Sequence, residues 1–166
     1  MRLGLVSDTH DNVALSRVAA AFFRERACDL VLHLGDVTEP ATVDVFAGLP
    51  MRFLRGNNDD RRELAPVLAQ NGFPEILDDW TDRMEGVLVA AHHGHLTPRF
   101  GSLEPDLLLH GHTHRMRATR VGRTLVVNPG ALHRAARKTV ALVELPTRAV
   151  TFHEVAAGGV TALRSG

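Results

Sequence analysis

The chain has 166 residues, of which 45% are hydrophobic and 23% are charged, and this length predicts one domain over residues 1–166. Its 19 basic and 19 acidic residues cancel, so the composition gives no support to a general affinity for nucleic acid or for an anionic membrane. No apolar run approaches the ~20 residues of a membrane span, and Asp8 interrupts the first run too early for a signal peptide. Cys28 is the single cysteine, so it has no partner for an intrachain disulfide. For these reasons we expect a cytoplasmic protein.

Strands and helices are predicted to alternate through the first two thirds of the chain. Short apolar runs that end at polar residues predict strands over residues 2–7, 29–34, 51–55, 86–91 and 107–109. After the first strand, apolar side chains recur at helical spacing, with Asp11 or Asn12 as the candidate cap: Leu15, Val18, Ala19 and Phe22. Two further helices are predicted over residues 39–47, which open with Pro40, and over residues 61–70, which contain Pro66.

The last third of the chain predicts antiparallel strands instead. Residues 115–120 and 123–127 flank Val121-Gly122, which is a hairpin signal, and residues 138–145 and 149–155 flank a second turn at 146–148. Residues 160–163 could still pack against this part. The pattern therefore indicates an α/β half followed by a β-rich half, with two sheets packed together and helices outside.

Side chains that bind metals follow five of the predicted strands. They occur in six motifs: Asp8-x-His10, Gly35-Asp36, Gly56-Asn57-Asn58-Asp59, His93-Gly94-His95, Gly111-His112-Thr113-His114 and Asn128-Pro129-Gly130. Loops at the carboxyl ends of strands converge in open α/β sheets, so we expect these side chains to meet. Carboxylate and imidazole together suit Mn, Ni, Fe or Zn. Seven ligands are too many for one tetrahedral ion, and they favour two ions that share a carboxylate, an arrangement that activates water against phosphate esters.

Taken in order, the six motifs resemble those of the calcineurin-like metallophosphoesterase superfamily. The narrower resemblance is to its small single-domain phosphodiesterases of the YfcE/MJ0936 type, and it begins with the run from Gly4 to Asp11. The motifs span residues 4–130, so the resemblance covers nearly the whole chain. It implies a four-layer α-β-β-α sandwich of two packed mixed sheets with flanking helices, and a dinuclear metal site at one edge.

The resemblance also implies a metal ligand set and a reaction. Three residues would hold each ion and one would bridge them: Asp8, His10 and His114 for the first, Asn57, His93 and His112 for the second, and Asp36 for both. Because His112 and His114 are two residues apart, they would point the same way if their segment is extended. Each ligating histidine should have its other ring nitrogen hydrogen-bonded. The implied reaction is attack of a metal-bridging hydroxide on a phosphate ester, with Mn preferred among the candidate ions.

Residues beside the ligands receive supporting roles. Asp59 would orient Asn57 or neighbouring groups, and His95 could contact substrate phosphate or supply a proton. Asn58 stands where much of the superfamily has a proton-donating histidine, and an amide has no proton to release near neutral pH. This departure favours diesters with acidic leaving groups and leaves Asn58 a substrate-binding role. The other histidines are expected outside the ligand set, with some packed or behind it and some at the surface: His33, His92 and His110, and then His133 and His153.

Plainer explanations and other functions stay open. In isolation Asp8, Asp36 and residues 57–59 could be turn residues, and the histidines of residues 92–95 could be solvated. A non-catalytic scaffold resembling the retromer subunit Vps29 would share the fold, although retention of all seven ligands argues against it. A nuclease would need a local arginine face. We expect a small phosphodiester as partner, no membrane, and either a monomer or a homo-oligomer. Residues 97–101 would stand in place of a longer helix that the YfcE/MJ0936-type phosphodiesterases have between the positions of His93 and His112.

Overall fold

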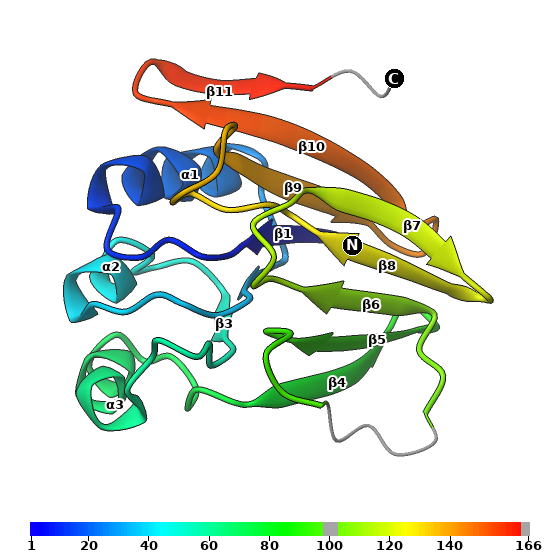
Figure 1. The fold of residues 1–166 in the computed structure, drawn as a ribbon, viewed down its shortest axis with the longest axis horizontal. Helices are drawn as coiled ribbons and strands as arrows, with labels where there is room; N and C mark the ends of the chain where they lie inside the picture. Colours follow the sequence, from blue (N-terminus) through cyan, green and yellow to red (C-terminus); the bar gives the residue numbers. More distant parts are fainter. Residues whose placement is uncertain (98–102, 164–166) are drawn as a thin grey trace.

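The computed structural model describes residues 1–97 and 103–163 of the chain, and their strands form two mixed sheets (Figure 1). The first sheet has six strands, which in sheet order are β11 (Gly159–Ala162), β10 (Ala149–Ala156), β9 (Thr139–Glu144), β1 (Arg2–Val6), β2 (Leu30–His33) and β3 (Met51–Phe53). The second has five, which in sheet order are β4 (Asp79–Met84), β5 (Val87–His92), β6 (Leu107–His110), β8 (Thr124–Asn128) and β7 (Arg117–Val121).

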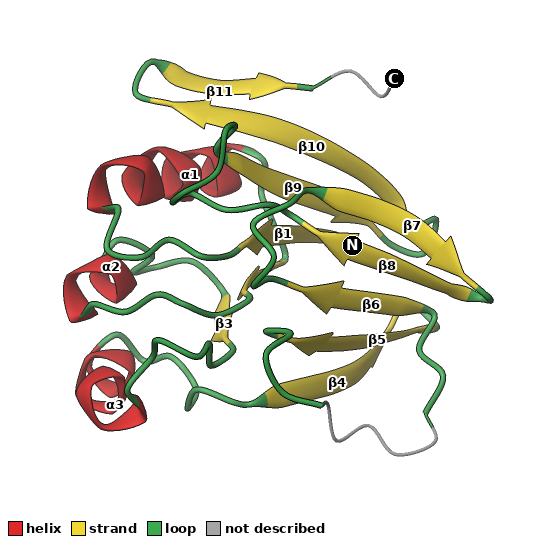
Figure 2. Cartoon of the chain, in the orientation of Figure 1, coloured by secondary structure: helices red, strands yellow, loops and turns green. Residues whose placement is uncertain are grey.

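The two sheets pack face to face, and helices flank the six-stranded one (Figure 2). Leu3 and Leu5 of β1 lie in the core between the sheets, whereas Val6 points into the core beneath α1 (Val13–Glu25), α2 (Pro40–Asp44) and α3 (Arg61–Gln70). The predicted α/β sandwich of two mixed sheets is therefore confirmed. Within residues 1–97 and 103–163, all three helices lie on the side of the six-stranded sheet that faces away from the other sheet. Residues 97–101, which we expected to replace a longer helix, fall mostly outside the described residues.

Local signals explain most of the helices. The side chain of Asn12 accepts a hydrogen bond from the backbone N–H of Leu15, at 3.2 Å, so it caps α1. In α3 the Asp60 side chain accepts from the N–H of Arg62, and the helix has the predicted bounds despite Pro66. The short α2 opens at Pro40 as expected but ends before the predicted boundary.

Two sequence expectations need correction. The strand β4 was not predicted; it pairs with β5 through a tight turn in which Glu85 and Gly86 both have positive φ, 48° and 79°. Such a pair of left-handed residues is typical of tight hairpin turns, and the glycine at position 86 was the signal available in the sequence. His153 is buried rather than at the surface, because its ring packs against Phe22 with centroids 4.7 Å apart.

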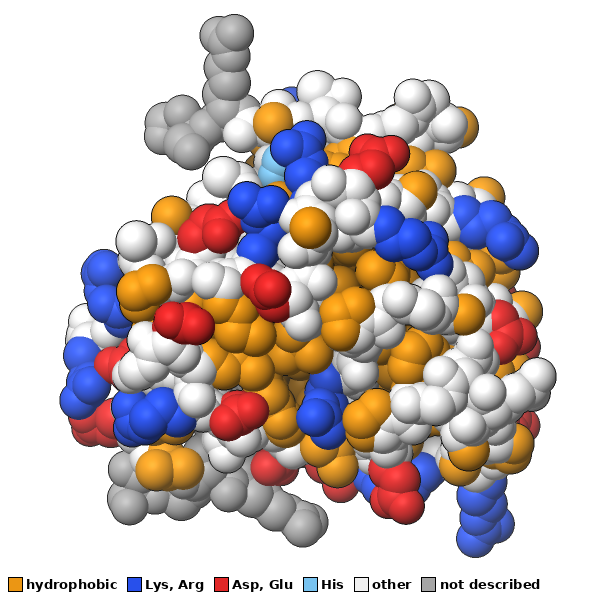
Figure 3. Space-filling model, turned by 180° about the vertical axis from the view of Figure 1, so that it is seen from behind, with side chains coloured by type: hydrophobic (Ala, Val, Ile, Leu, Met, Phe, Trp, Pro, Cys, Tyr) orange, Lys and Arg blue, Asp and Glu red, His pale blue; other side chains and the backbone are white. Residues whose placement is uncertain are grey.

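The face of the molecule seen from behind carries both positive and negative side chains (Figure 3), in agreement with the net charge of zero. From behind, side chains of both charges surround a central apolar area (Figure 3). None of the described helices combines the length and hydropathy needed to cross a membrane.

Candidate metal centre

The predicted ligands lie where strands of both sheets end. The strands β1, β2 and β3 run parallel in one sheet, and β5 and β6 run parallel in the other. Asp8, Asp36 and Asn57 follow the first three strands, while His93 and His112 follow the other two. Because parallel strands end at the same edge, the two sheets bring these loops together, as the sequence predicted.

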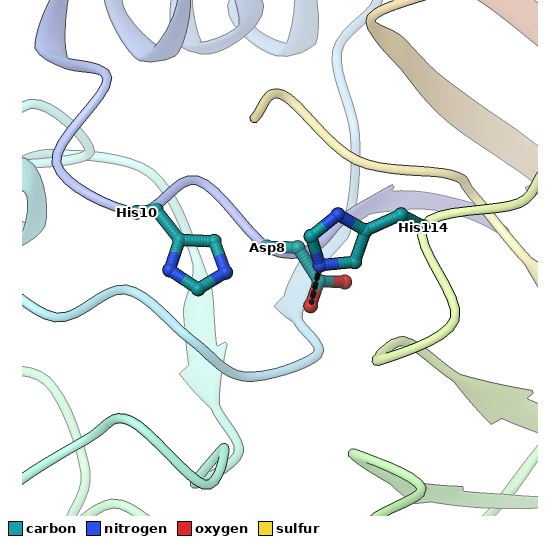
Figure 4. A group of neighbouring side chains, drawn as sticks. All are labelled: Asp8, His10 and His114. Atoms are coloured by element: carbon teal, nitrogen blue, oxygen red, sulfur yellow. Dashed lines mark ion pairs between the residues drawn. The ribbon is translucent and has the colours of Figure 1, made fainter. Parts of the chain in front are cut away.

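One group of side chains consists of Asp8, His10 and His114 (Figure 4). Their ligand atoms all lie within 4.8 Å of one another, and Nε2 of His114 is 3.2 Å from Oδ1 of Asp8. Asp8 is buried, whereas both imidazoles are partly exposed. These three residues are the set that the resemblance implied for the first ion, and their donors could hold one divalent cation.

Asp36 lies between this group and the next. Its Oδ2 atom is 3.4 Å from Nε2 of His10 and 3.5 Å from Nε2 of His93. Asp8, Asp36 and His93 also form a buried group whose ligand atoms lie within 4.8 Å of one another. One carboxylate oxygen therefore faces a histidine from each implied set, as a bridging ligand would.

The second implied set gathers around His93. Its Nε2 is 3.2 Å from Oδ1 of Asn57, and its ring centroid is 5.1 Å from that of His112. Its Nδ1 donates a hydrogen bond to the carbonyl of Leu34, at 2.6 Å. That bond places a proton on Nδ1 and leaves Nε2 as the nitrogen that faces Asp36 and Asn57, where a metal ion would take the place of any proton on it.

The buried carboxylate of Asp8 tests whether a cation fits. Its Oδ2 accepts hydrogen bonds from the Ser7 hydroxyl, at 2.5 Å, and from the backbone N–H of His112, at 3.0 Å. Its Oδ1 is buried and accepts no hydrogen bond from any described residue. Burying a charged oxygen without a partner is costly, and a cation beside Nε2 of His114 would satisfy it. The donors thus fit divalent ions.

The pKa values of the two carboxylates shift in opposite directions. Burial raises the pKa of Asp8 above its usual range, which the Ser7 hydrogen bond only partly offsets. Burial would also raise the pKa of Asp36, but hydrogen bonds from His93 and Asn58 outweigh it and hold this pKa well below its usual range. Asp36 therefore remains ionised, which suits a ligand shared by two cations.

The loops that present these residues have a left-handed backbone. Five of the seven implied ligands have positive φ: Asp8 at 51°, His10 at 39°, Asp36 at 56°, His112 at 67° and His114 at 57°. Such conformations cost non-glycine residues about 1–2 kcal/mol each, and they concentrate at functional sites. They also correct one expectation. The segment of His112 and His114 is not extended, and the two rings turn apart, one toward His93 and the other toward Asp8.

Asp59 and Asn128 hold the ligand loops from behind. The Asp59 carboxylate accepts from the backbone N–H groups of Asp36, Gly56 and Thr38, at 2.9, 2.8 and 2.8 Å. The buried Asn128 amide donates to the carbonyl of Gly111, at 2.7 Å, and thus braces the loop of His112 and His114. The motifs predicted a place near the ligands for Asp59, but they did not predict that Asn128 braces this loop.

Asn58 and His95 flank the ligands on the exposed side. The backbone N–H and side-chain amide of Asn58 donate to the two oxygens of Asp36, each at 2.8 Å. The ring centroid of His95 is 5.3 Å from that of His93 and 6.4 Å from that of His112. Burial, followed by the charges of His93 and Arg55, lowers the pKa of His95. Both residues therefore border the centre, and Asn58 is already engaged with Asp36.

Of two further histidines, His33 lies where the sequence predicted it and His133 does not. His33 is fully buried behind the ligands, where it contacts the Thr9 hydroxyl, at 3.0 Å, as expected for a packed residue. His133 was expected at the surface, yet its ring centroid is 4.9 Å from that of His10. Only the tertiary fold brings the loop of His133 to the first strand's end, so no local signal could have found it.

Comparison with known proteins agrees with the geometry. A family model described as the calcineurin-like phosphoesterase superfamily domain matches residues 1–148. The phosphodiesterase MJ0936 of Methanocaldococcus jannaschii is 30% identical over 138 residues, which are 78% of this chain and 83% of that protein.

Solved structures with the same fold include enzymes and a Vps29 protein. An archaeal phosphodiesterase superposes with a TM-score of 0.82 at 25% identity, over 93% of this chain and 99% of that one. YfcE, a phosphoesterase from E. coli, gives 0.77 at 18% identity, over 99% and 97%. Wild-type Vps29 from Entamoeba histolytica, complexed with Zn²⁺, gives 0.71 at 20% identity, over 99% and 98%. The last two likenesses concern the fold alone.

Proposed function

Because the chain belongs to the calcineurin-like phosphoesterase superfamily, we propose that it is a metal-dependent phosphodiesterase that holds two divalent ions at the carboxyl ends of its strands. The observation that carries this proposal is Oδ2 of Asp36, which faces Nε2 of His10 and Nε2 of His93 at nearly equal distances of 3.4 and 3.5 Å. A shared anion between two ligand groups supports a dinuclear site over a single structural ion.

Each residue of the centre would have a defined role in binding the two ions. Asp8, His10 and His114 would hold one ion, Asn57, His93 and His112 the other, and Asp36 would join the two groups. When bound, the pair of ions would supply Lewis acidity toward phosphate oxygens and would lower the pKa of a bound water. The neutral carbonyl oxygen of Asn57 limits the negative charge in the second group, which favours binding of an anionic ester.

Asn58 and His95 bear on the choice of substrate. The Asn58 amide cannot protonate a leaving group, and its donors already bind Asp36. His95, beside His93 and His112, would contact the phosphate or donate through its ring N–H. Its lowered pKa keeps it neutral near pH 7, so it would be a poor source of protons for a basic leaving group. We therefore infer a preference for small diesters with acidic leaving groups over alkyl monoesters.

A scaffold without catalysis is the alternative, since Vps29 has the same fold. Metal binding alone would not separate the two, because a Vps29 from Entamoeba histolytica is itself complexed with Zn²⁺. The catalytic reading is supported by the combination of all seven ligand-type residues with a curated relative that is named a phosphodiesterase. Turnover is therefore the property that distinguishes them.

The test is a metal-by-substrate screen on protein stripped of metal. Chelated protein should not hydrolyse bis(p-nitrophenyl) phosphate, and Mn²⁺ or Ni²⁺ should restore turnover better than Mg²⁺, because the imidazole ligands suit softer ions. An alkyl monoester should react more slowly by about 10²–10⁴-fold, the usual contribution of a general acid.

Asp36→Asn, purified in the same way, reports any contaminating phosphatase. Turnover that survives exhaustive chelation would contradict the metal dependence. Bound metal without turnover on any diester would favour the scaffold instead.

A further inference from the structure

An open pocket adjoins the metal centre. It has a volume of about 800 Å³ and is lined by His112 and His114 on one side and by the loop of residues 134–137 on the other. This volume lies within the ~300–1,000 Å³ of typical small-molecule sites. A molecule bound at the two histidines could therefore extend directly into this pocket.

Three arginines give the pocket its charge. Arg115, Arg134 and Arg137 line it, all three are exposed, and no acidic residue is among its described lining. None of their guanidinium groups makes a hydrogen bond or ion pair with a described residue. Other arginines of the chain are paired with carboxylates: Arg2 with Glu144, Arg55 with Asp78 and Arg123 with Asp106. The free donors of the pocket are thus available to an anionic ligand.

The loop that presents two of these arginines is anchored to the body of the protein. At its start the side-chain amide of Asn12 donates to the carbonyl of Leu132, at 2.9 Å, and at its end the buried Thr139 hydroxyl donates to the carbonyl of Pro129, at 2.7 Å. Within the loop, Lys138 donates from its Nζ to the carbonyl of Ala135, at 2.6 Å. Arg134 has a left-handed backbone, with φ of 46°, and follows His133, whose ring contacts His10. These contacts hold the basic loop beside the first ligand group, so its charges lie at a defined place relative to His10 and His114.

We propose that this arginine pocket binds a second phosphate group of the substrate, separate from the diester at the metal centre. Guanidinium groups recognise phosphate through paired N–H donors, and three of them beside one cavity favour a dianion over a neutral group. The preferred substrate class is then a phosphodiester that bears a further phosphate on one of its alcohol groups. This inference rests on the proposed function, because it assigns the scissile ester to the adjoining metal centre.

Two chromogenic substrates that differ in one group test the proposal. They are thymidine 5′-(p-nitrophenyl phosphate) and the same compound with a 3′-phosphate. The Mn²⁺-loaded protein should show a KM about tenfold lower for the 3′-phosphorylated compound, as expected for charge-assisted hydrogen bonds. The double variant Arg134→Ala/Arg137→Ala should lose this difference, and Arg134→Lys/Arg137→Lys should keep part of it. Arg120→Ala, an exposed arginine on β7, is the matched control and should keep it fully.

Equilibrium binding separates this inference from the proposed function. Titration calorimetry with thymidine 3′,5′-bisphosphate and thymidine 5′-monophosphate requires no turnover. The wild type should bind the bisphosphate about tenfold more tightly, and the double alanine variant should not. If neither chromogenic substrate reacts but this preference is present, the pocket is supported and the diesterase proposal fails. Equal affinities and equal KM values in the wild type would overturn the pocket.

Discussion

At the scale of single residues, Asp36 has the most constrained position in the centre. Both its oxygens accept hydrogen bonds from Asn58, and one of them also faces His10 and His93. Its backbone N–H is held by Asp59, at 2.9 Å. This residue is therefore fixed in place by groups that do not depend on a bound ion, and its charge is maintained by its depressed pKa.

We predict that Asp36→Asn lowers bound metal from two ions per chain to one or none and removes nearly all diesterase turnover. The amide has almost the same shape but lacks the negative charge and the second equivalent oxygen that a bridge needs. His95→Ala should retain both ions, because His95 lies outside the two ligand groups. Elemental analysis of the two purified variants after gel filtration measures the difference. Two ions in Asp36→Asn would show that another residue is the bridge.

The sequence predicted this centre at the level of motifs but not of every contact. Ligand-type residues after five strands were sufficient to predict that Asp8, Asp36 and His93 meet. The contact of His133 with His10 and the bracing by Asn128 depend on how the two sheets superpose. Because those contacts join segments far apart in the chain, local pattern carries no information about them.

At the scale of elements, the centre requires backbone segments to approach closely. Gly111, between β6 and the loop of His112, shows this most clearly. A Cβ at this position would overlap the Ser7 hydroxyl and lie 2.9 Å from the carbonyl of Leu34 and 3.0 Å from Oδ2 of Asp8. The glycine thus permits the end of β6 to touch the ends of β1 and β2, which belong to the other sheet.

We predict that Gly111→Ala destabilises the fold by about 1–3 kcal/mol, the usual cost of overpacking. The melting temperature should then fall by roughly 2–12 °C for a chain of this size. Gly158→Ala is the matched control, because its Cβ would meet no atom within 4 Å, and it should melt like the wild type. Differential scanning calorimetry compares the three proteins. Equal melting temperatures for Gly111→Ala and Gly158→Ala would mean that the ends of the two sheets separate without cost.

Helices and strands were predicted correctly where the apolar residues of a segment follow a single helical or strand periodicity. The bounds of α3 and the pairing of β9 with β10 follow from apolar spacing and turn residues. The strand β4 is mostly polar, because it pairs on one side only and exposes several side chains, so its sequence lacks the apolar run of a buried strand. For His112 and His114, tertiary contacts impose the left-handed backbone, which the sequence of a short loop does not determine.

At the scale of the whole molecule, the buried His33 beside the candidate metal centre resists protonation. His33 is fully buried between Phe46 and Phe53 and contacts the Thr9 hydroxyl through Nε2, at 3.0 Å. Its Nδ1 accepts from the N–H of Gly35, at 3.3 Å, which fixes a neutral tautomer. Burial, reinforced by the charge of His93, lowers the pKa of His33 from 6.5 to about 3. Folding of the whole chain is thereby linked to pH.

We predict that the free energy of unfolding decreases as pH falls from about 6.5 toward about 3. In this window the unfolded chain binds a proton at His33 that the folded chain excludes, so acid favours the unfolded state. Above pH 6.5 both states hold His33 neutral, and this contribution does not change with pH. Its size over the window should be on the order of a few kcal/mol. Urea unfolding of metal-free protein at a series of pH values measures it.

His33→Gln provides the comparison, because the amide can still donate and accept but does not titrate. The other histidines titrate in both proteins, so the difference between the two pH profiles isolates His33. The variant should be less stable than the wild type at pH 7, and the gap should narrow as pH falls. Parallel profiles between pH 7 and pH 4 would show that His33 is protonated as easily in the folded chain as in the unfolded one. The burial of His33 would then not link folding of the chain to pH.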